Sequence, residues 1–127
     1  MKVTRFNHAA INVEGKLESV RDFYLRFLGI PVADRGEMAQ LIDGEWLQLG
    51  ETQIHIIDAP YAGEERNPLG PHISLYVDDL EGGVSELEAR GLEMVSIGEG
   101  LGRIVWVTDP AGNTVEFQQD PLLVAAD

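Results

Sequence analysis

The sequence contains no cysteine. Disulfides, thiolate metal ligands and nucleophilic cysteine chemistry are therefore excluded together, and any metal ion must be bound by histidine, aspartate or glutamate. No apolar run approaches the roughly 20 residues that a membrane-spanning helix needs. The residues after Met1 lead into Asn7 and His8 without the apolar block of a signal peptide. These absences predict a cytoplasmic protein with no membrane partner.

Basic residues are also scarce. The chain has 9 lysines and arginines against 22 aspartates and glutamates, which gives a formal net charge of -13. Such a charge repels phosphate groups unless a basic patch offsets it, and the basic residues are scattered along the sequence. We therefore expect no nucleic acid and no anionic membrane surface among the partners. A contribution to solubility is the favoured reading of this charge, and attraction of a cationic ligand is the alternative.

What the sequence does contain is an internal repeat. Its 127 residues, 44% of them hydrophobic, have the size and composition of one globular domain. Segment 8–13 resembles segment 72–77 in its apolar pattern, and each is followed by an acidic link and then by a helical apolar period. His8 and His72 occupy equivalent places in the two copies.

Apolar residues at three- and four-residue steps predict one helix in each half. The first helix ends at Gly29 and the second at Gly91, and their apolar stripes contain Leu17, Val20, Phe23, Tyr24, Phe27 and Leu28, then Leu80, Val84 and Leu87. Strand-like runs follow each helix, at residues 38–42, 46–49 and 53–57, then at 94–97, 104–108 and 114–118. We expect one α+β domain over residues 1–127, made of two tandem βαβββ modules at about 1–58 and 71–120. The turn-rich linker at about 59–70 has a second interpretation as a lid.

Alternation along the strands predicts a metal site. Successive side chains point to opposite faces of a strand, so His8 and His55 in one module, and His72 and Glu116 in the other, point away from the helix-packed face. If the sheets curve, these four residues line a cleft. Three imidazoles and one carboxylate suit one divalent Zn, Ni, Co, Mn or Fe(II) ion, with water completing the coordination. His55 has an alternative role as an accessory histidine beside a three-ligand ion.

The same alternation leaves two interpretations of the larger aromatic residues. Trp46, Tyr76 and Trp106 either face the cleft, where they would suit an apolar or planar substrate, or pack in the core.

The repeat and three of its segments resemble the vicinal oxygen chelate superfamily, which includes glyoxalase I, extradiol dioxygenases, fosfomycin-resistance transferases and bleomycin-binding proteins. The segments are His8 on the first strand, residues 22–29 and the turn and strand at residues 109–116. The resemblance covers residues 3–118. It implies that His8, His72 and Glu116 match a two-histidine, one-carboxylate ligand set. His55 stands where bacterial glyoxalase I has a glutamate. The resemblance also implies a homodimer.

The resemblance implies a metal-dependent enzyme whose small substrate is chelated through two vicinal oxygens. A glyoxalase-like lyase or isomerase is favoured, in which Glu116 or a metal-bound hydroxide moves a proton. A ring-cleaving extradiol dioxygenase that uses Fe(II) is one alternative. The other is a non-catalytic bleomycin-type resistance protein, for which the acidic charge would suit a cationic drug.

Overall fold

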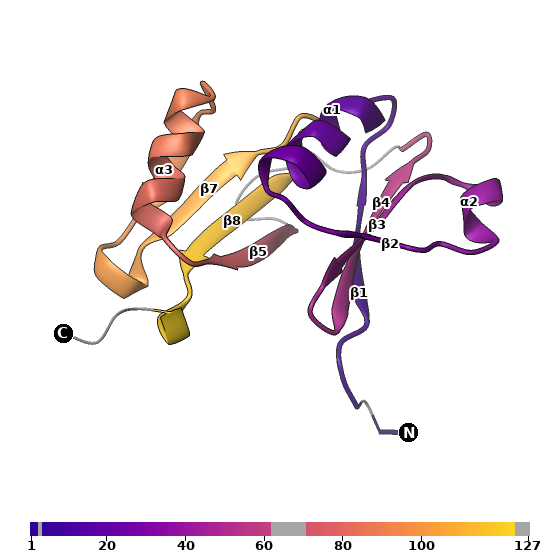
Figure 1. Cartoon of the computed structure of the whole chain (residues 1–127), viewed down its shortest axis with the longest axis horizontal. Helices are drawn as coiled ribbons and strands as arrows, with labels where there is room; N and C mark the ends of the chain where they lie inside the picture. Colours follow the sequence, from indigo (N-terminus) through magenta and orange to yellow (C-terminus); the bar gives the residue numbers. More distant parts are fainter. Residues whose placement is uncertain (3, 62–70, 124–127) are drawn as a thin grey trace. The chain divides into compact units, whose positions relative to one another are not determined.

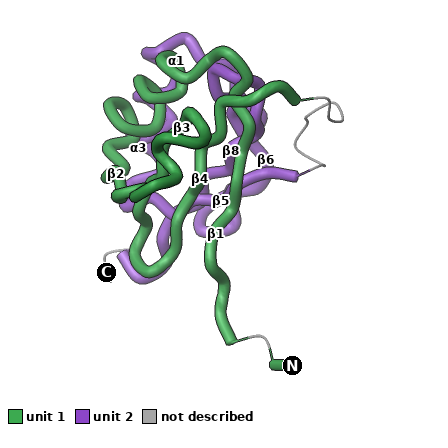
Figure 2. Tube along the Cα trace, turned by 90° about the vertical axis from the view of Figure 1, so that its right-hand side faces the viewer, with its two compact units in different colours: residues 1–64 green, residues 65–127 purple. Residues whose placement is uncertain are grey.

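The chain divides into two compact units that repeat one architecture. The computed structural model describes residues 1–2, 4–61 and 71–123. Unit 1 is residues 1–64 and unit 2 is residues 65–127, drawn in green and purple in Figure 2. Each unit contains one four-stranded mixed sheet, which confirms the α+β class and the tandem βαβββ modules (Figure 1). Residues 62–70 of the expected linker and lid lie outside the described residues.

Unit 1 has the strand order β1-β4-β3-β2, in which β1 runs parallel to β4 and the other neighbours are antiparallel. Its elements are β1 (His8–Asn12), α1 (Leu17–Arg21), a π-helical segment (Asp22–Phe27), β2 (Val32–Ala33), α2 (Met38–Leu41), β3 (Asp43–Leu49) and β4 (Thr52–Asp58). The buried apolar side chains of the helical segments and of β3 and β4 form its core, among them Val20, Phe23, Tyr24, Leu47, Ile54 and Ile56.

Unit 2 repeats this arrangement with the strand order β5-β8-β7-β6. Its elements are β5 (His72–Val77), α3 (Leu80–Ala89), β6 (Met94–Ile97), a 3-10 turn (Gly100–Gly102), β7 (Ile104–Thr108), β8 (Thr114–Gln119) and a second 3-10 turn (Pro121–Leu123). The Asp79 side chain caps α3 by accepting a hydrogen bond from the Gly82 N–H at 3.0 Å. The core consists of Leu80, Val84 and Leu87 of α3 together with the buried apolar residues of β7 and β8, Val105, Val107, Val115 and Phe117.

Both predicted helices form, and the first is longer than α1 alone. α1 continues into the π-helical segment, in which the Leu28 N–H donates to the Phe23 carbonyl at 2.9 Å. Gly29 then takes a φ of 69°, a conformation that favours glycine, and the helix ends there as the sequence predicts. None of the helices in the described part of the chain is long and apolar enough to cross a membrane.

The strand predicted at residues 38–42 is wrong. Residues Met38–Leu41 form the short helix α2, and the strand beside β3 is β2, at Val32–Ala33. The guanidinium of Arg35 explains the difference, because it donates to the carbonyls of Met38, Ile42 and Gly44 and holds this segment as a turn. A run of five residues, four of them apolar, cannot by itself distinguish a strand from a helical turn.

Candidate metal centre

The two sheets place their chemically active residues at matching positions. In unit 1, His55 of β4 lies between Ala10 of β1 and Trp46 of β3. In unit 2, Glu116 of β8 lies between Ser74 of β5 and Trp106 of β7. His8 and His72 begin β1 and β5, two residues before Ala10 and Ser74. Within each unit, the predicted pair of ligands therefore shares one face of its sheet.

In unit 1, three rings form one stack. The imidazoles of His8 and His55 lie 3.8 Å apart between centroids at an interplanar angle of 16°, and the indole of Trp46 covers the other side of His55 at 4.2 Å and 5°. Burial, the charge of His8 and the charge of Arg35 all lower the pKa of His55 below its usual value. His55 is therefore held as a neutral imidazole, which is the form that binds a metal.

A series of hydrogen-bonded side-chain amides determines which ring nitrogen of His55 carries the proton and which has a lone pair for a metal ion. The Gln48 side-chain amide donates to the carbonyls of Gly50 at 2.7 Å and Thr52 at 3.3 Å, so its oxygen is left to accept from the Gln53 Nε2 at 2.9 Å. The Gln53 oxygen then lies 2.8 Å from the His55 Nε2. Because an amide oxygen only accepts, His55 carries its proton on Nε2 and keeps a lone pair on Nδ1.

In unit 2, Glu116 is only 6% exposed, and donors surround its carboxylate. Its Oε1 accepts from the Trp106 indole Nε1 at 2.8 Å, and its Oε2 accepts from the Ser74 hydroxyl at 2.7 Å and from the Gln118 amide at 2.8 Å. Burial alone raises the pKa of Glu116, but these hydrogen bonds and the charge of His72 together lower it below its usual value. Glu116 is therefore an anion at neutral pH.

The pair in unit 2 fits a metal ion. The His72 Nε2 lies 3.4 Å from the Glu116 Oε1, which is longer than a good hydrogen bond. Two ligands of a tetrahedral ion with bonds of about 2.0–2.1 Å lie about 3.3–3.4 Å from each other. A nitrogen and an anionic oxygen at this spacing match two neighbouring positions of such an ion.

The stacked pair in unit 1 does not fit one ion in this conformation. A bound ion lies in the plane of the imidazole, about 2.0–2.1 Å from its nitrogen. The planes of His8 and His55 are nearly parallel and stacked, so no point near both rings lies in both planes. One ring must turn before both can bind the same ion. His8 is the more exposed of the two rings, and its side chain is hydrogen-bonded to that of Asn7, whereas His55 lies between two rings. His8 is therefore the ring that can turn more easily.

The four predicted residues thus divide between the units, His8 and His55 in unit 1, His72 and Glu116 in unit 2, and each unit is described by itself. Within neither unit do three histidine or acidic side chains of the described residues gather around one point.

The alternatives left open for the tryptophans are resolved in part, since Trp46 and Trp106 both contact a predicted ligand. Sequence reasoning missed the donors Ser74 and Gln118, although strand alternation places both on the face of Glu116.

The turn before β8 sets the position of Glu116. Asp109 is 3% exposed, and its Oδ1 accepts from the N–H groups of Ala111 at 2.9 Å and Asn113 at 2.8 Å. Its Oδ2 accepts from the Asn113 side-chain amide at 3.2 Å. Gly112 takes a φ of 90° between them. This closed turn fixes where β8 begins, and with it the register of Glu116 against Ser74 and Trp106.

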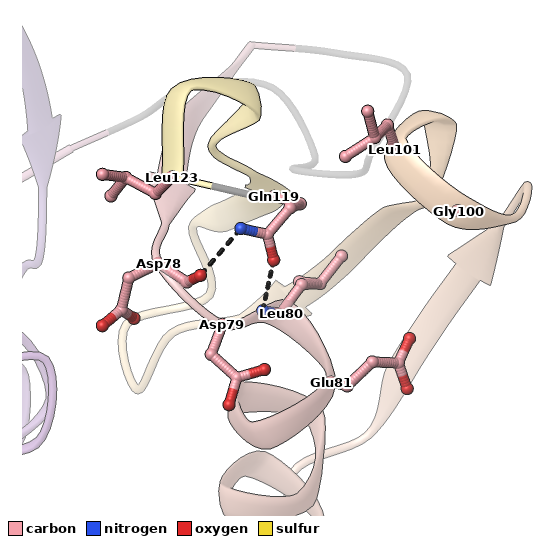
Figure 3. Close-up of a pocket in the computed structure, with 8 residues that line it drawn as sticks. All are labelled: Asp78, Asp79, Leu80, Glu81, Gly100, Leu101, Gln119 and Leu123. Atoms are coloured by element: carbon pink, nitrogen blue, oxygen red, sulfur yellow. Dashed lines mark hydrogen bonds between the residues drawn. The ribbon is translucent and has the colours of Figure 1, made fainter. Parts of the chain in front are cut away.

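Unit 2 also has a pocket that contains none of the four predicted ligands. Its volume is about 480 Å³, and it lies where α3 begins (Figure 3). In this pocket the Gln119 amide links two backbone groups, because it donates to the Asp78 carbonyl at 2.7 Å and accepts from the Leu80 N–H at 3.0 Å. The other lining residues are Asp79, Glu81, Gly100, Leu101 and Leu123.

Comparison with known proteins agrees with this repeat. The family model of the glyoxalase/bleomycin resistance protein/dioxygenase superfamily matches residues 5–117, almost the whole chain. The chain belongs to this superfamily. The resemblance drawn from His8 and from residues 22–29 and 109–116 is therefore confirmed. No sequence among the curated proteins matches the chain.

Solved structures of the superfamily share the fold. A glyoxalase family protein from Bacillus anthracis has a TM-score of 0.79 and 23% identity, covering 94% of this chain and 98% of that one. Lactoylglutathione lyase from Agrobacterium tumefaciens has a TM-score of 0.68 and 19% identity over 96% and 98% of the two chains. A mutant of the fosfomycin resistance protein FosX from Listeria monocytogenes, complexed with Mn(II) and a dihydroxypropylphosphonic acid, has a TM-score of 0.73 and 15% identity, covering 95% of each chain. At these identities the likeness shows the fold alone.

Proposed function

We propose that this superfamily member binds one divalent metal ion and acts on a small substrate chelated to it through two vicinal oxygens. His72 and Glu116 hold the ion, and His8 and His55 complete the ligand set. The observation that carries the proposal is the 3.4 Å spacing of the His72 nitrogen and the Glu116 oxygen, together with a carboxylate that its neighbours keep ionised. FosX, a member with the same fold, binds Mn(II), which supports a metal of this class here.

The ion would supply stabilisation of the negative charge that develops on a substrate oxygen. The chain's own residues prepare the place for it. Glu116 would contribute the one negative charge of the proposed ligand set, so that a divalent ion held there would keep a net charge of about +1 and stay electrophilic. The Trp106 indole and the Ser74 hydroxyl hold the carboxylate in place. Glu116 is the residue on which we expect the chemistry to depend most.

We favour a lyase or isomerase of the glyoxalase type, in which a proton moves between adjacent carbons of the substrate. This preference rests on the size of the chain, one two-module domain, and takes lactoylglutathione lyase, which shares the fold over 96% of the chain, as its precedent. Ring cleavage with Fe(II) uses the same ligand types and is the second candidate, because two histidines and one carboxylate form the ligand set of many non-haem iron oxygenases. We also propose that the protein acts as a homodimer.

Thermal unfolding with added ions tests the proposal. Protein purified without chelators or nickel is freed of metal, and Zn, Ni, Co, Mn and Fe(II) are then added one at a time. An ion present at a hundred times its dissociation constant should stabilise the fold by about 2.7 kcal/mol. His72→Ala should abolish the stabilisation, whereas Asp78→Ala, which removes an exposed carboxylate away from Glu116, should keep it. If no ion raises the unfolding temperature, the proposal is wrong.

Turnover assays separate the two reactions. The loaded protein is given a thiol–aldehyde adduct with adjacent oxygens, or a catechol under air. Rearrangement of the adduct supports the lyase class, and oxygen uptake with catechol by the Fe(II) form supports the dioxygenase. Tight binding of a cationic drug by metal-free protein, with neither reaction, would favour a sequestering protein.

A further inference from the structure

The Glu116 carboxylate accepts hydrogen bonds from side chains on both of its oxygens. Three donors reach it from three positions of the sheet: Trp106 on β7, Ser74 on β5 and Gln118 on β8 itself. The Trp106 indole reaches Oε1, and the other two donors reach Oε2. The carboxylate is thus fixed by one neighbour on each adjacent strand as well as by its own strand.

One acceptor position of the Glu116 carboxylate is not occupied by these three hydrogen bonds. An ionised carboxylate has about four acceptor positions, two on each oxygen. Ser74 and Gln118 occupy both positions on Oε2, and Trp106 occupies one on Oε1. The remaining position is on Oε1, the oxygen that lies 3.4 Å from the His72 Nε2.

We propose that Trp106, Ser74 and Gln118 are positioning residues that restrict Glu116 to a single-oxygen metal ligand and withhold it from proton transfer. The inference rests on the proposed function, because it assigns the role of one residue of that site. An oxygen with both positions occupied can neither share the ion nor accept a proton from substrate. The ion would take the last position on Oε1, so the proton acceptor of the reaction would be a group other than Glu116.

The internal repeat offers a comparison within the same chain. Trp46 is paired with His55 in the register by which Trp106 is paired with Glu116. Trp46 places its ring face on the imidazole, whereas Trp106 directs its N–H at the carboxylate. A tryptophan thus contacts a predicted ligand in both units, by ring stacking on the imidazole of His55 and by a hydrogen bond to the carboxylate of Glu116.

Calorimetric titration of metal-free protein with Zn²⁺ or Mn²⁺ tests the positioning role. Loss of a group that orients a metal ligand typically weakens metal binding about 10- to 100-fold. We expect a loss of this size in Trp106→Phe and in Ser74→Ala, and recovery in Ser74→Thr, which restores the hydroxyl. Tyr76→Phe is the control. Tyr76 is exposed and follows Ser74 on the same face of β5, so the variant loses a hydroxyl but should bind the ion as the unaltered protein does.

Indole NMR gives a readout that needs neither metal nor substrate. The chain has 2 tryptophans, so its spectrum has two indole N–H signals, and Trp106→Phe assigns them. In metal-free protein, Glu116→Ala should shift the Trp106 signal and speed its exchange with water, while the Trp46 signal stays in place. An unshifted Trp106 signal would show that the bond to Glu116 does not form in solution, and would overturn the inference.

The outcomes of these experiments are distinct. If the unaltered protein binds no ion, the proposed function fails and this inference fails with it. If the unaltered protein binds an ion and Trp106→Phe and Ser74→Ala bind it equally well, only the positioning role is overturned. Weaker binding in these two variants, recovery in Ser74→Thr and no change in Tyr76→Phe support it.

Discussion

The imidazole rings of His8 and His55 are stacked face to face, with 3.8 Å between their centroids and 16° between their planes. In unit 2, by contrast, the nitrogen of His72 and the oxygen of Glu116 already have the spacing of two ligands of one ion. The two pairs come from matching strands of the repeat, yet only the second has a spacing that fits the proposed metal ion. This difference ranks the four proposed ligands by their expected contribution to metal binding.

We expect His72→Ala and Glu116→Ala to weaken metal binding more than His8→Ala does. The first two variants remove half of a prearranged pair, whereas His8 must first leave its stack on His55, which offsets part of what it contributes as a ligand. Calorimetric titration of the three variants with Zn²⁺ measures the order. A loss in His8→Ala as large as the loss in His72→Ala would contradict it.

The lowered pKa of His55 predicts how metal-free protein responds to acid. The unfolded chain protonates this ring near its usual pKa of about 6.5, while the folded chain resists protonation until a lower pH. Below about pH 6.5 the unfolded state therefore binds more protons, and the free energy of unfolding falls as the pH falls towards the folded pKa. Above about pH 6.5 this contribution is fully present.

Urea unfolding in the presence of a chelator, at several values between about pH 7.5 and 5.5, measures this contribution. His55→Gln is the control, because it cannot titrate. The unaltered protein should lose stability relative to His55→Gln as the pH falls through this window. A constant difference between the two proteins would show that the stacked ring has an ordinary pKa. Glu116 does not interfere, since its lowered pKa places its own loss of stability at more acidic pH.

The turn at Asp109 should be essential for the stability of unit 2. Asp109→Ala removes three hydrogen bonds of the turn, two of them donated by backbone N–H groups, and we expect a loss of about 3 kcal/mol in the free energy of unfolding. Asp109→Asn keeps one acceptor oxygen for the backbone and should lose about 1 kcal/mol. Urea unfolding at neutral pH compares them, and equal stability of the two variants would refute this account of the turn.

Two neighbouring glycines of α3 form a matched test of the helix cap. A methyl group at Gly83 meets nothing within 4 Å, so Gly83→Ala should stabilise the protein by about 0.5–1 kcal/mol through helix propensity. A methyl group at Gly82 would collide with the Asp79 carboxylate that caps the helix. Gly82→Ala should therefore be the less stable of the two in thermal unfolding, and the reverse order would contradict the cap geometry.

The sequence predicts the modules well because their signals are local. The apolar stripes of Leu17 to Leu28 and of Leu80 to Leu87 specify helices, and alternation along each strand correctly placed His55 and Glu116 on the faces of His8 and His72. The error at residues 38–42 arose where the local pattern was ambiguous. The helical turn at this place is held by Arg35, a residue outside the run, whose guanidinium donates hydrogen bonds to backbone carbonyls.

The arrangement around the predicted ligands depends on contacts between residues that are far apart in the sequence. Ser74 and Glu116 are 42 residues apart in sequence and meet only because β5 and β8 pair in one register. The stacking of His8 on His55 depends likewise on the parallel pairing of β1 with β4 and on the side-chain conformations of both rings. Strand alternation identifies which residues share a face, but not which of them bond.

Metal analysis tests the central claim most directly. Protein purified without chelators or nickel affinity, then supplied with a mixture of divalent ions and desalted, is analysed for its metal content per chain. The account predicts about one tightly held ion per chain in the unaltered protein and almost none in the double variant His72→Ala/Glu116→Ala. Unaltered protein without metal, or a double variant that retains as much metal as the unaltered protein, would contradict it.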